Sequence, residues 1–254
     1  MFNVDEYLKR IGLSAGNVRA NDLMTLSLLQ LRHVTSVPYE NIDLFMDKPL
    51  SLNLNDIFDK IVTRGRGGYC FELNALYSWL LTQLGYSVKN YFARFLRNET
   101  TIPVRRHRVL VVNVNGKDYF TDVGIGSVAP RFPLALEEDT EQVQGNEKYR
   151  FTRDETLGWV LHEWRNESWQ PYLSFTLDEA LEIDFVQPSF YCQYHPDSPF
   201  NKHYIVAIKT PLGRRFLSNH DYKEFEGDTL TYSEENCSDY RVDILLREKF
   251  GIIV

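Results

Sequence analysis

Residues 64–74 read Arg-Gly-Arg-Gly-Gly-Tyr-Cys-Phe-Glu-Leu-Asn and place a cysteine directly after a glycine-rich loop. Three glycines fall within residues 64–68, which indicates a backbone path that other residues rarely follow. Apolar side chains then recur at helical spacing over residues 73–84, and Gly85 stands at a usual helix stop. The sequence therefore predicts that Cys70 lies in the first turn of a buried helix.

A cysteine at this position has an environment suited to nucleophilic chemistry. The N-terminus of a helix presents unpaired backbone N–H groups and a partial positive charge, which favour the thiolate form of Cys70. The thiolate is the form that attacks a carbonyl carbon, and the same N–H groups can hold the resulting oxyanion. Because most single cysteines are buried and inert, the hypothesis needs a base and an orienting group near Cys70.

A predicted hairpin supplies both groups. Asn115-Gly116 joins two runs rich in Val, Tyr and Phe, which is a strong signal for a two-residue turn. In that register His107 lies opposite Gly124, and Asp122 points to the same face as His107 as its diagonal neighbour, roughly 7–8 Å away at the backbone. We expect the glycine to leave room for a His–Asp contact. A solvated histidine and a turn-capping carboxylate remain the alternative, and spacing alone does not bring the hairpin to Cys70.

The remaining pattern runs from helices through strands to a mixed segment, which predicts an α+β fold. Residues 133–148 are acidic and polar, and we expect a surface loop there. The expected helices cover residues 4–11, 23–34, 54–62, 70–84 and 239–250. The expected strands cover residues 88–96, 108–114, 117–123, 149–152, 158–164, 169–176, 203–209 and 214–218, the first six forming a small antiparallel sheet or barrel.

Composition narrows the class of protein. The 254 residues are 43% hydrophobic and 25% charged, which suits a soluble globular chain with a sizeable core. The net charge of −7 and the lack of a basic cluster argue against a nucleic-acid partner, and no apolar run predicts a membrane helix or signal peptide. Three widely spaced cysteines indicate neither a disulfide framework nor a zinc site, so we expect a reducing cytoplasm and no metal.

Five segments together resemble one known family. Arg66–Asn74 resembles the RGG-aromatic-C-x-E-x-N signature of the arylamine N-acetyltransferases, in their prokaryotic type. Val37–Asn41 is similar to the VPFEN segment of that family, with Tyr39 where Phe is commoner. His107–Leu110, Asp122–Gly126 and Pro196–Phe200 resemble three further family segments and follow in the family's order. The resemblance therefore spans nearly the whole chain.

The resemblance implies a three-part fold with a core similar to that of papain-like cysteine enzymes. Residues 1–86 would form an N-terminal helical bundle that carries the cysteine. Residues 87–190 would form a central antiparallel β-barrel that carries the histidine and the aspartate. Residues 191–254 would form a C-terminal α/β lid. In the family, the cysteine, histidine and aspartate meet between the first two parts. The resemblance therefore implies that the hairpin lies next to Cys70, which strand geometry alone does not predict.

The implied reaction is a ping-pong transfer of acetyl from acetyl-CoA to Cys70, and then to an arylamine, an arylhydrazine or, as O-acetylation, an N-hydroxyarylamine. His107 would move protons and Asp122 would hold its tautomer. An amide synthase using a larger or carrier-bound acyl group, a papain-like or transglutaminase-like hydrolase, and a non-catalytic binding protein are the alternatives. Neither a monomer nor a homodimer is excluded.

The resemblance also implies supporting residues around the catalytic set. Arg66 and Glu40 would form a buried ion pair beneath the glycine loop, while Glu72 and Asn74 would brace that loop. The implied coenzyme A contacts are Pro103, Val104 and Gly126. The implied substrate contacts are Tyr39, Tyr69, Gly124 and Ile125.

Overall fold

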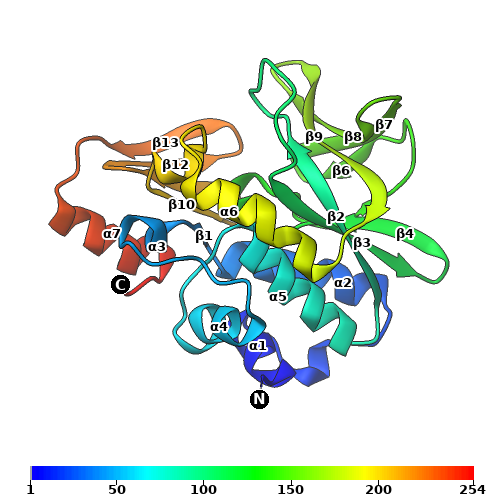
Figure 1. Ribbon diagram of the computed structural model, residues 1–254, viewed down its shortest axis with the longest axis horizontal. Coiled ribbons are helices and arrows are strands. Elements are labelled where there is room, and N and C mark those ends of the chain that lie inside the picture. Colours follow the sequence, from blue (N-terminus) through cyan, green and yellow to red (C-terminus); the bar gives the residue numbers. More distant parts are fainter. Residues whose placement is uncertain (1) are drawn as a thin grey trace.

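The helices of the N-terminal part surround the one that carries Cys70. The computed structural model describes residues 2–254 and gives α1 (Val4–Arg10), α2 (Leu23–Ser36), α3 (Ile42–Phe45), α4 (Leu54–Phe58) and α5 (Cys70–Gln83) (Figure 1). Asp22 caps α2 by accepting a hydrogen bond from Thr25 N at 2.8 Å. A π-helical turn, Asp59–Thr63, extends α4 toward the glycine loop. None of the helices within residues 2–254 has the length and apolarity to cross a membrane.

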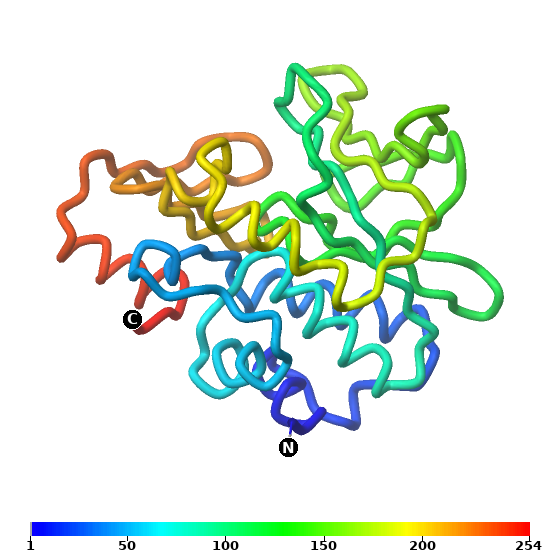
Figure 2. Tube along the Cα trace, in the orientation of Figure 1, coloured from blue at the N-terminus to red at the C-terminus, as the bar shows by residue number. Residues whose placement is uncertain are grey.

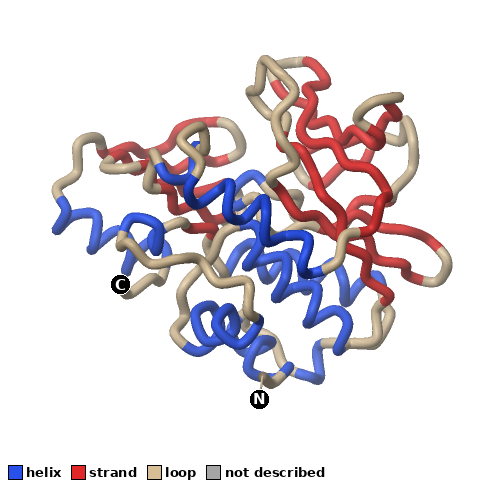
Figure 3. The backbone as a smooth tube through the Cα atoms, viewed as in Figure 1, coloured by secondary structure: helices blue, strands red, loops and turns tan. Residues whose placement is uncertain are grey.

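The central part is an antiparallel sheet of eight strands that curls into a nearly closed barrel. The strands lie in the order β5-β4-β3-β2-β9-β8-β7-β6. Figure 3 shows these strands gathered above the helices of the N-terminal part. The bounds are β2 (Ser87–Phe95), β3 (His107–Val114), β4 (Lys117–Thr121), β5 (Leu134–Ala135), β6 (Gln142–Gln144), β7 (Glu147–Asp154), β8 (Gly158–Arg165) and β9 (Ser168–Glu179).

The predicted hairpin register is confirmed. Val114 pairs with Lys117 and Leu110 with Thr121 across the Asn115-Gly116 turn, both of whose residues have positive φ. Ladder pairing with β4 ends at Leu110, so it does not continue as far as His107.

Glutamine side chains connect the two edges of the barrel. Gln142 bonds both the N–H and the carbonyl of Ala135, at 2.7 and 2.8 Å. Gln144 does the same with Phe132, at 3.0 and 2.8 Å. A side-chain amide carries the donor and acceptor of a peptide group, so it replaces a ladder bond. The expectation of a plain loop over residues 133–148 is therefore wrong, because β5 and β6 lie within it.

The C-terminal part is a second antiparallel sheet with strand order β1-β10-β11-β12-β13. Its edge strand β1 (Tyr39–Glu40) comes from the N-terminal part and pairs Tyr39 with Ala207. The other strands are β10 (Ile205–Lys209), β11 (Gly213–Ser218), β12 (Asp221–Glu226) and β13 (Thr229–Glu234). Helix α7 (Asp239–Phe250) covers this sheet and has the bounds expected from sequence. The sequence reasoning missed β12 and β13.

Three hydrophobic cores correspond to the helices, the barrel and the second sheet. The fold is thus α+β with helices, a barrel and a second sheet, as expected. Helix α6 (Val186–Tyr194) runs alongside α5, as Figure 2 shows, and Tyr69 Oη lies 2.5 Å from Ser189 Oγ. The expected boundary at residue 190 falls inside α6. The chain leaves the barrel after β9 and continues into this helix, which packs on the helical core.

Candidate active site

The glycine loop is held by backbone contacts with the segment before α3. Gly68 pairs with Tyr39, Glu40 N donates to Gly68 O at 2.9 Å, and a Cβ on Gly67 would lie 2.1 Å from Pro38 O. Neither Gly67 nor Gly68 has a positive φ, so these glycines are required for close approach rather than for an unusual backbone angle. The expectation of an unusual path applies only to Gly65, at φ +68°.

An arginine that sequence reasoning missed holds the same loop from α1. Arg10 Nη2 donates to the carbonyls of Gly65 and Arg66, both at 3.2 Å. Its Nε and Nη1 donate to Ile61 O at 2.9 Å and Ser36 O at 2.8 Å. The planar guanidinium thus joins three backbone segments behind the nucleophile helix.

Cys70 begins α5 and faces the start of β3. Its Sγ lies 3.8 Å from Arg106 O, directly before His107 in the chain. A Cβ on Gly124 would lie 3.0 Å from Cys70 Cα and 2.6 Å from Asn74 Nδ2. The glycine therefore makes room for α5, and not for the His–Asp contact as expected, because the chain after β4 packs against this helix.

His107 and Asp122 form the expected pair. His107 Nε2 lies 2.6 Å from Asp122 Oδ2, and both side chains are buried. Since Asp122 occupies Nε2, the other ring nitrogen, Nδ1, is the one available to a thiol or substrate. Asp122 Oδ1 accepts from Gly124 N at 2.8 Å and from Asn74 Nδ2 at 2.9 Å.

Asn74 connects the cysteine helix to this pair. It lies one helical turn after Cys70, and its Nδ2 donates to both Asp122 and Arg108 O while its Oδ1 accepts from Val123 N at 3.0 Å. The expectation that Asn74 braces the glycine loop is wrong, because the side chain points to the barrel. Its i, i+4 spacing from Cys70 was the signal that could have revealed this role.

Burial changes the expected chemistry of the thiol. Burial, followed by the nearby Cys192 and Asp122, raises the pKa of Cys70 well above its ordinary value, while the Phe71 N–H lowers it. The helix N-terminus favours the thiolate as expected, through the Phe71 N–H, but burial opposes that effect and exceeds it. Ionisation of Cys70 needs an adjacent proton acceptor, a role that the imidazole of His107 can fill.

Cys70 and His107 line one cavity of about 500 Å³ between the barrel and the second sheet. Three of the expected substrate contacts line it as well: Tyr39, Gly124 and Ile125. Apolar and aromatic side chains from both sheets and from two 3-10 turns line it too: Phe95, Val128, Pro199, Phe200, Ile205, Ala207, Phe216 and Phe225. Six polar or charged residues complete the wall: Arg97, Asn98, Glu99, Arg106, Ser127 and Arg214. Such a wall suits a flat, apolar ligand.

Four expected contacts lie away from this cavity. Tyr69 is the N-cap residue of α5 and is fully buried against Ser189 of α6, so it is not among the cavity's lining residues. Gly126 packs against Tyr39, where a Cβ would lie 2.8 Å from Tyr39 Cβ. Pro103 O accepts from Arg94, and Val104 lines a separate groove beside α6.

A group of buried charges, which we call the loop cluster, lies beneath the glycine loop. The expected Arg66–Glu40 pair is confirmed, with Arg66 Nη2 at 2.9 Å from Glu40 Oε1. Sequence reasoning missed Lys60 and Asp43, whose Nζ and Oδ2 lie 2.7 Å apart. The full loop cluster is Glu40, Asp43, Lys60, Arg66 and Glu72. No sequence signal pointed to Lys60, because it comes from the irregular π-helical turn.

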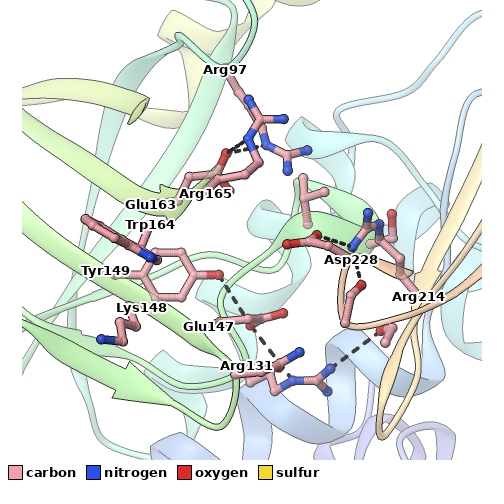
Figure 4. Close-up of a pocket in the computed structure, with 15 residues that line it drawn as sticks. Arg97, Arg131, Glu147, Lys148, Tyr149, Glu163, Trp164, Arg165, Arg214 and Asp228 are labelled. Atoms are coloured by element: carbon pink, nitrogen blue, oxygen red, sulfur yellow. Dashed lines mark hydrogen bonds and ion pairs between the residues drawn. The ribbon is translucent and has the colours of Figure 1, made fainter. Parts of the chain in front are cut away.

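A second charged group, which we call the seam cluster, joins the barrel to the second sheet. Lys209 Nζ lies 2.7 Å from Glu147 Oε1, and Arg131 Nε lies 3.8 Å from Glu147 Oε2. Arg131, Glu147 and Lys209 make up this cluster. Figure 4 shows Glu147 and Arg131 at the edge of a small polar pocket, with Arg214 paired to Asp228 nearby. This pocket shares Arg214 with the cavity of Cys70.

These features define a class of site: a buried cysteine that begins a helix and lines one cavity with a histidine, whose aspartate partner comes from the same antiparallel barrel. Among residues 2–254 no three His, Cys, Asp or Glu side chains form a group that could hold a metal.

Comparison with known proteins gives the family. Residues 22–254 match the N-acetyltransferase family. The arylamine N-acetyltransferase of Mycolicibacterium smegmatis is 37% identical over 82% of this chain and 77% of its own. The arylamine N-acetyltransferase / N-hydroxyarylamine O-acetyltransferase of Salmonella typhimurium is 30% identical over 89% and 81%. The Mycobacterium marinum enzyme in complex with CoA superposes with a TM-score of 0.90 at 30% identity, covering 98% and 93%. The chain belongs to the arylamine N-acetyltransferase family, and it is an acyltransferase.

Proposed function

We propose that this chain transfers acetyl from acetyl-CoA to arylamines and arylhydrazines, and to the oxygen of N-hydroxyarylamines, through a thioester on Cys70. The observation that carries the proposal is the single cavity that exposes both Cys70 and His107, with Asp122 bonded behind His107. The relatives named above are arylamine N-acetyltransferases, and one solved relative holds CoA.

In the first half-reaction, Cys70 Sγ gives its proton to His107 Nδ1 and attacks the thioester carbonyl carbon of the donor. The carbon–sulfur bond to CoA breaks, and the leaving thiolate takes the proton from His107. Asp122 holds the imidazole in the tautomer that leaves Nδ1 free to accept, and it stabilises the imidazolium. Asn74 and the Gly124 N–H hold Asp122 in place.

In the second half-reaction, the acceptor nitrogen, or the oxygen of an N-hydroxyarylamine, attacks the acetyl carbon on Cys70 and loses its proton to His107. The bond between the acetyl carbon and the Cys70 sulfur breaks, and His107 returns the proton to that sulfur. The aromatic wall of the cavity, which includes Phe200 and Phe216, would hold the ring of the acceptor and shield the thioester from water. Shielding matters because water competes with the amine for the same carbonyl carbon.

The test is intact-protein mass spectrometry after brief mixing with acetyl-CoA, first without an acceptor and then with an aromatic amine. We expect one acetyl adduct, which disappears when the amine is added as acetylated amine forms. Cys70→Ala should give no adduct, whereas Cys192→Ala, at a second buried cysteine, should behave as the native protein does. Asp122→Asn should stay folded and react about 10³-fold more slowly or worse.

The same experiment separates the other functions. An adduct that forms only from a larger or carrier-bound thioester would replace the proposal with an amide synthase. Hydrolysis of peptides or amides without transfer to amine would replace it with a hydrolase. Equal acetylation of the native protein and of Cys70→Ala would contradict the thioester mechanism.

A further inference from the structure

The helix that carries Cys70 is capped by its own third residue. Glu72 Oε2 accepts a hydrogen bond from Tyr69 N at 3.0 Å, directly before the nucleophile. Glu72 is almost completely buried and does not line the cavity of Cys70. A Cβ on Gly68 would lie 3.0 Å from the same Oε2, so the glycine loop folds directly over this carboxylate.

Lys60 holds Glu72 from the opposite side. Its Nζ donates to both carboxylate oxygens of Glu72, at 3.0 and 3.1 Å, and lies 2.7 Å from Asp43 Oδ2. Like Glu72, Lys60 is buried, and both residues line a polar pocket whose lining includes neither Cys70 nor His107. Loss of Lys60 would leave the Glu72 carboxylate buried without a cation.

We infer that the buried Lys60–Glu72 ion pair is a positioning device for the nucleophile, in which Lys60 holds the Glu72 carboxylate on the Tyr69 N–H and so fixes the first turn of α5 and the Cys70 sulfur. Neither residue touches the reacting atoms. The inference deepens the proposed function and rests on its assignment of Cys70 as the nucleophile.

The electrostatics of the pair make its effect depend on pH. Burial raises the pKa of Glu72 to about 7, and Lys60 and the Tyr69 N–H oppose that rise. Glu72 therefore loses its charge as pH falls through about 7, and its bond to Tyr69 N weakens. The other titratable or charged groups that face this pair or line its pocket are Tyr39, Glu40, Asp43, Lys48, Asp56, Asp59, Arg64, Arg66, Tyr69 and Cys70.

The experiment compares Lys60→Met with Lys48→Met, a matched change at a lysine that lines the same pocket without contacting Glu72. Single-turnover acetylation of Cys70 by acetyl-CoA is measured from about pH 6 to about pH 9. The native rate and that of Lys48→Met should fall on the acid side of about pH 7. In Lys60→Met this limb should move up by about one pH unit or more, with acetylation about tenfold slower at neutral pH.

An unchanged profile in folded Lys60→Met would overturn the inference, and so would an equal loss at every pH, since a purely structural role acts uniformly. If Lys60→Met does not fold, Glu72→Gln gives the answer, because its amide oxygen still accepts from Tyr69 N and does not titrate. The acid limb should then move to lower pH, because residue 72 no longer contributes to it, and an unmoved limb would overturn the inference.

A substrate-independent measurement separates this inference from the proposed function. Hydrogen exchange of the Tyr69 amide should be about tenfold faster in Lys60→Met than in Lys48→Met. If the native protein takes no acetyl group from acetyl-CoA, the proposed function fails while the exchange result still stands. Equal exchange in both variants would refute the positioning role by itself.

Discussion

The loop cluster and the seam cluster both bury charge near the active site, but in opposite ratios of anions to cations. The loop cluster sets three carboxylates against two cations, whereas the seam cluster sets Glu147 against Arg131 and Lys209. Burial would lower the pKa of Lys60, but the three carboxylates outweigh it and raise that pKa above its usual value. Burial lowers the pKa of Lys209 to about 8, despite Glu147. The loop cluster therefore stabilises the charged form of its lysine, whereas the seam cluster does not offset the burial of Lys209.

This difference follows the role of each region. The loop cluster lies beneath the glycine loop that precedes Cys70. That loop is also held by backbone contacts with Pro38–Glu40 and by the side chain of Arg10. The seam cluster joins two sheets that each supply one wall of the cavity, and Lys209 also donates to Ala129 O across that joint. We expect changes in the loop cluster to affect stability most, and changes in the seam cluster to have smaller effects.

The largest effect should come from Arg66→Met, which removes the two donors, Nε and Nη2, that bond Oε1 of the buried Glu40. The free energy of unfolding should fall by about 3–5 kcal/mol, measured by urea denaturation. Arg64→Met is the matched control, since the Arg64 side chain is 59% exposed, against 7% for Arg66. The control should change stability by about 1 kcal/mol or less. Equal losses in both variants would contradict the comparison.

Glu147→Gln should have the next largest effect, because it removes the only carboxylate of the seam cluster. Lys209 can lose its proton instead of remaining charged, so the loss should be limited to about 1–3 kcal/mol. The same urea denaturation measures it. A loss as large as that of Arg66→Met would show that the two clusters hold their charges equally well.

The pH dependence of the unfolding free energy should show the lowered pKa of Lys209 directly. Its pKa is about 8 in the folded protein and 10.5 in the unfolded chain, so the unfolded chain binds more protons between these values. Stability therefore rises with pH across this window, by up to about 1.4 kcal/mol per pH unit from this group. The difference in unfolding free energy between the native protein and Lys209→Met isolates this contribution. The unfolding free energy of the native protein minus that of Lys209→Met should increase from pH 8 to pH 10, and a decrease would contradict this prediction.

The smallest effect should be that of Lys209→Met at neutral pH. The native protein there bears the full cost of burying the charged lysine, and Arg131 still partners Glu147 in the variant. We expect a change in unfolding free energy within about 1 kcal/mol. A loss of several kcal/mol, measured in the same titration, would mean that the seam cluster holds its lysine as firmly as the loop cluster holds Lys60.

Features that depend on local pattern were predicted well from sequence. The helices over residues 23–36 and 70–83 follow from apolar spacing, and the hairpin register follows from Asn115-Gly116. The His107–Asp122 contact follows from that register. Features without a local pattern were missed, such as the short strands β5 and β6, because glutamine side chains supply part of their pairing.

The sequence by itself determined a cysteine at a helix start, the His–Asp pair and the family. The first two depend on neighbours within about twenty residues, and the family follows from five short motifs in a fixed order. Only the tertiary structure decided how these parts meet. It directed Asn74 to Asp122, buried Tyr69 against α6, gave Gly124 its role beside Cys70, and assembled the loop cluster from four separate segments. Contacts between distant segments depend on packing and desolvation, which no periodicity along the chain encodes.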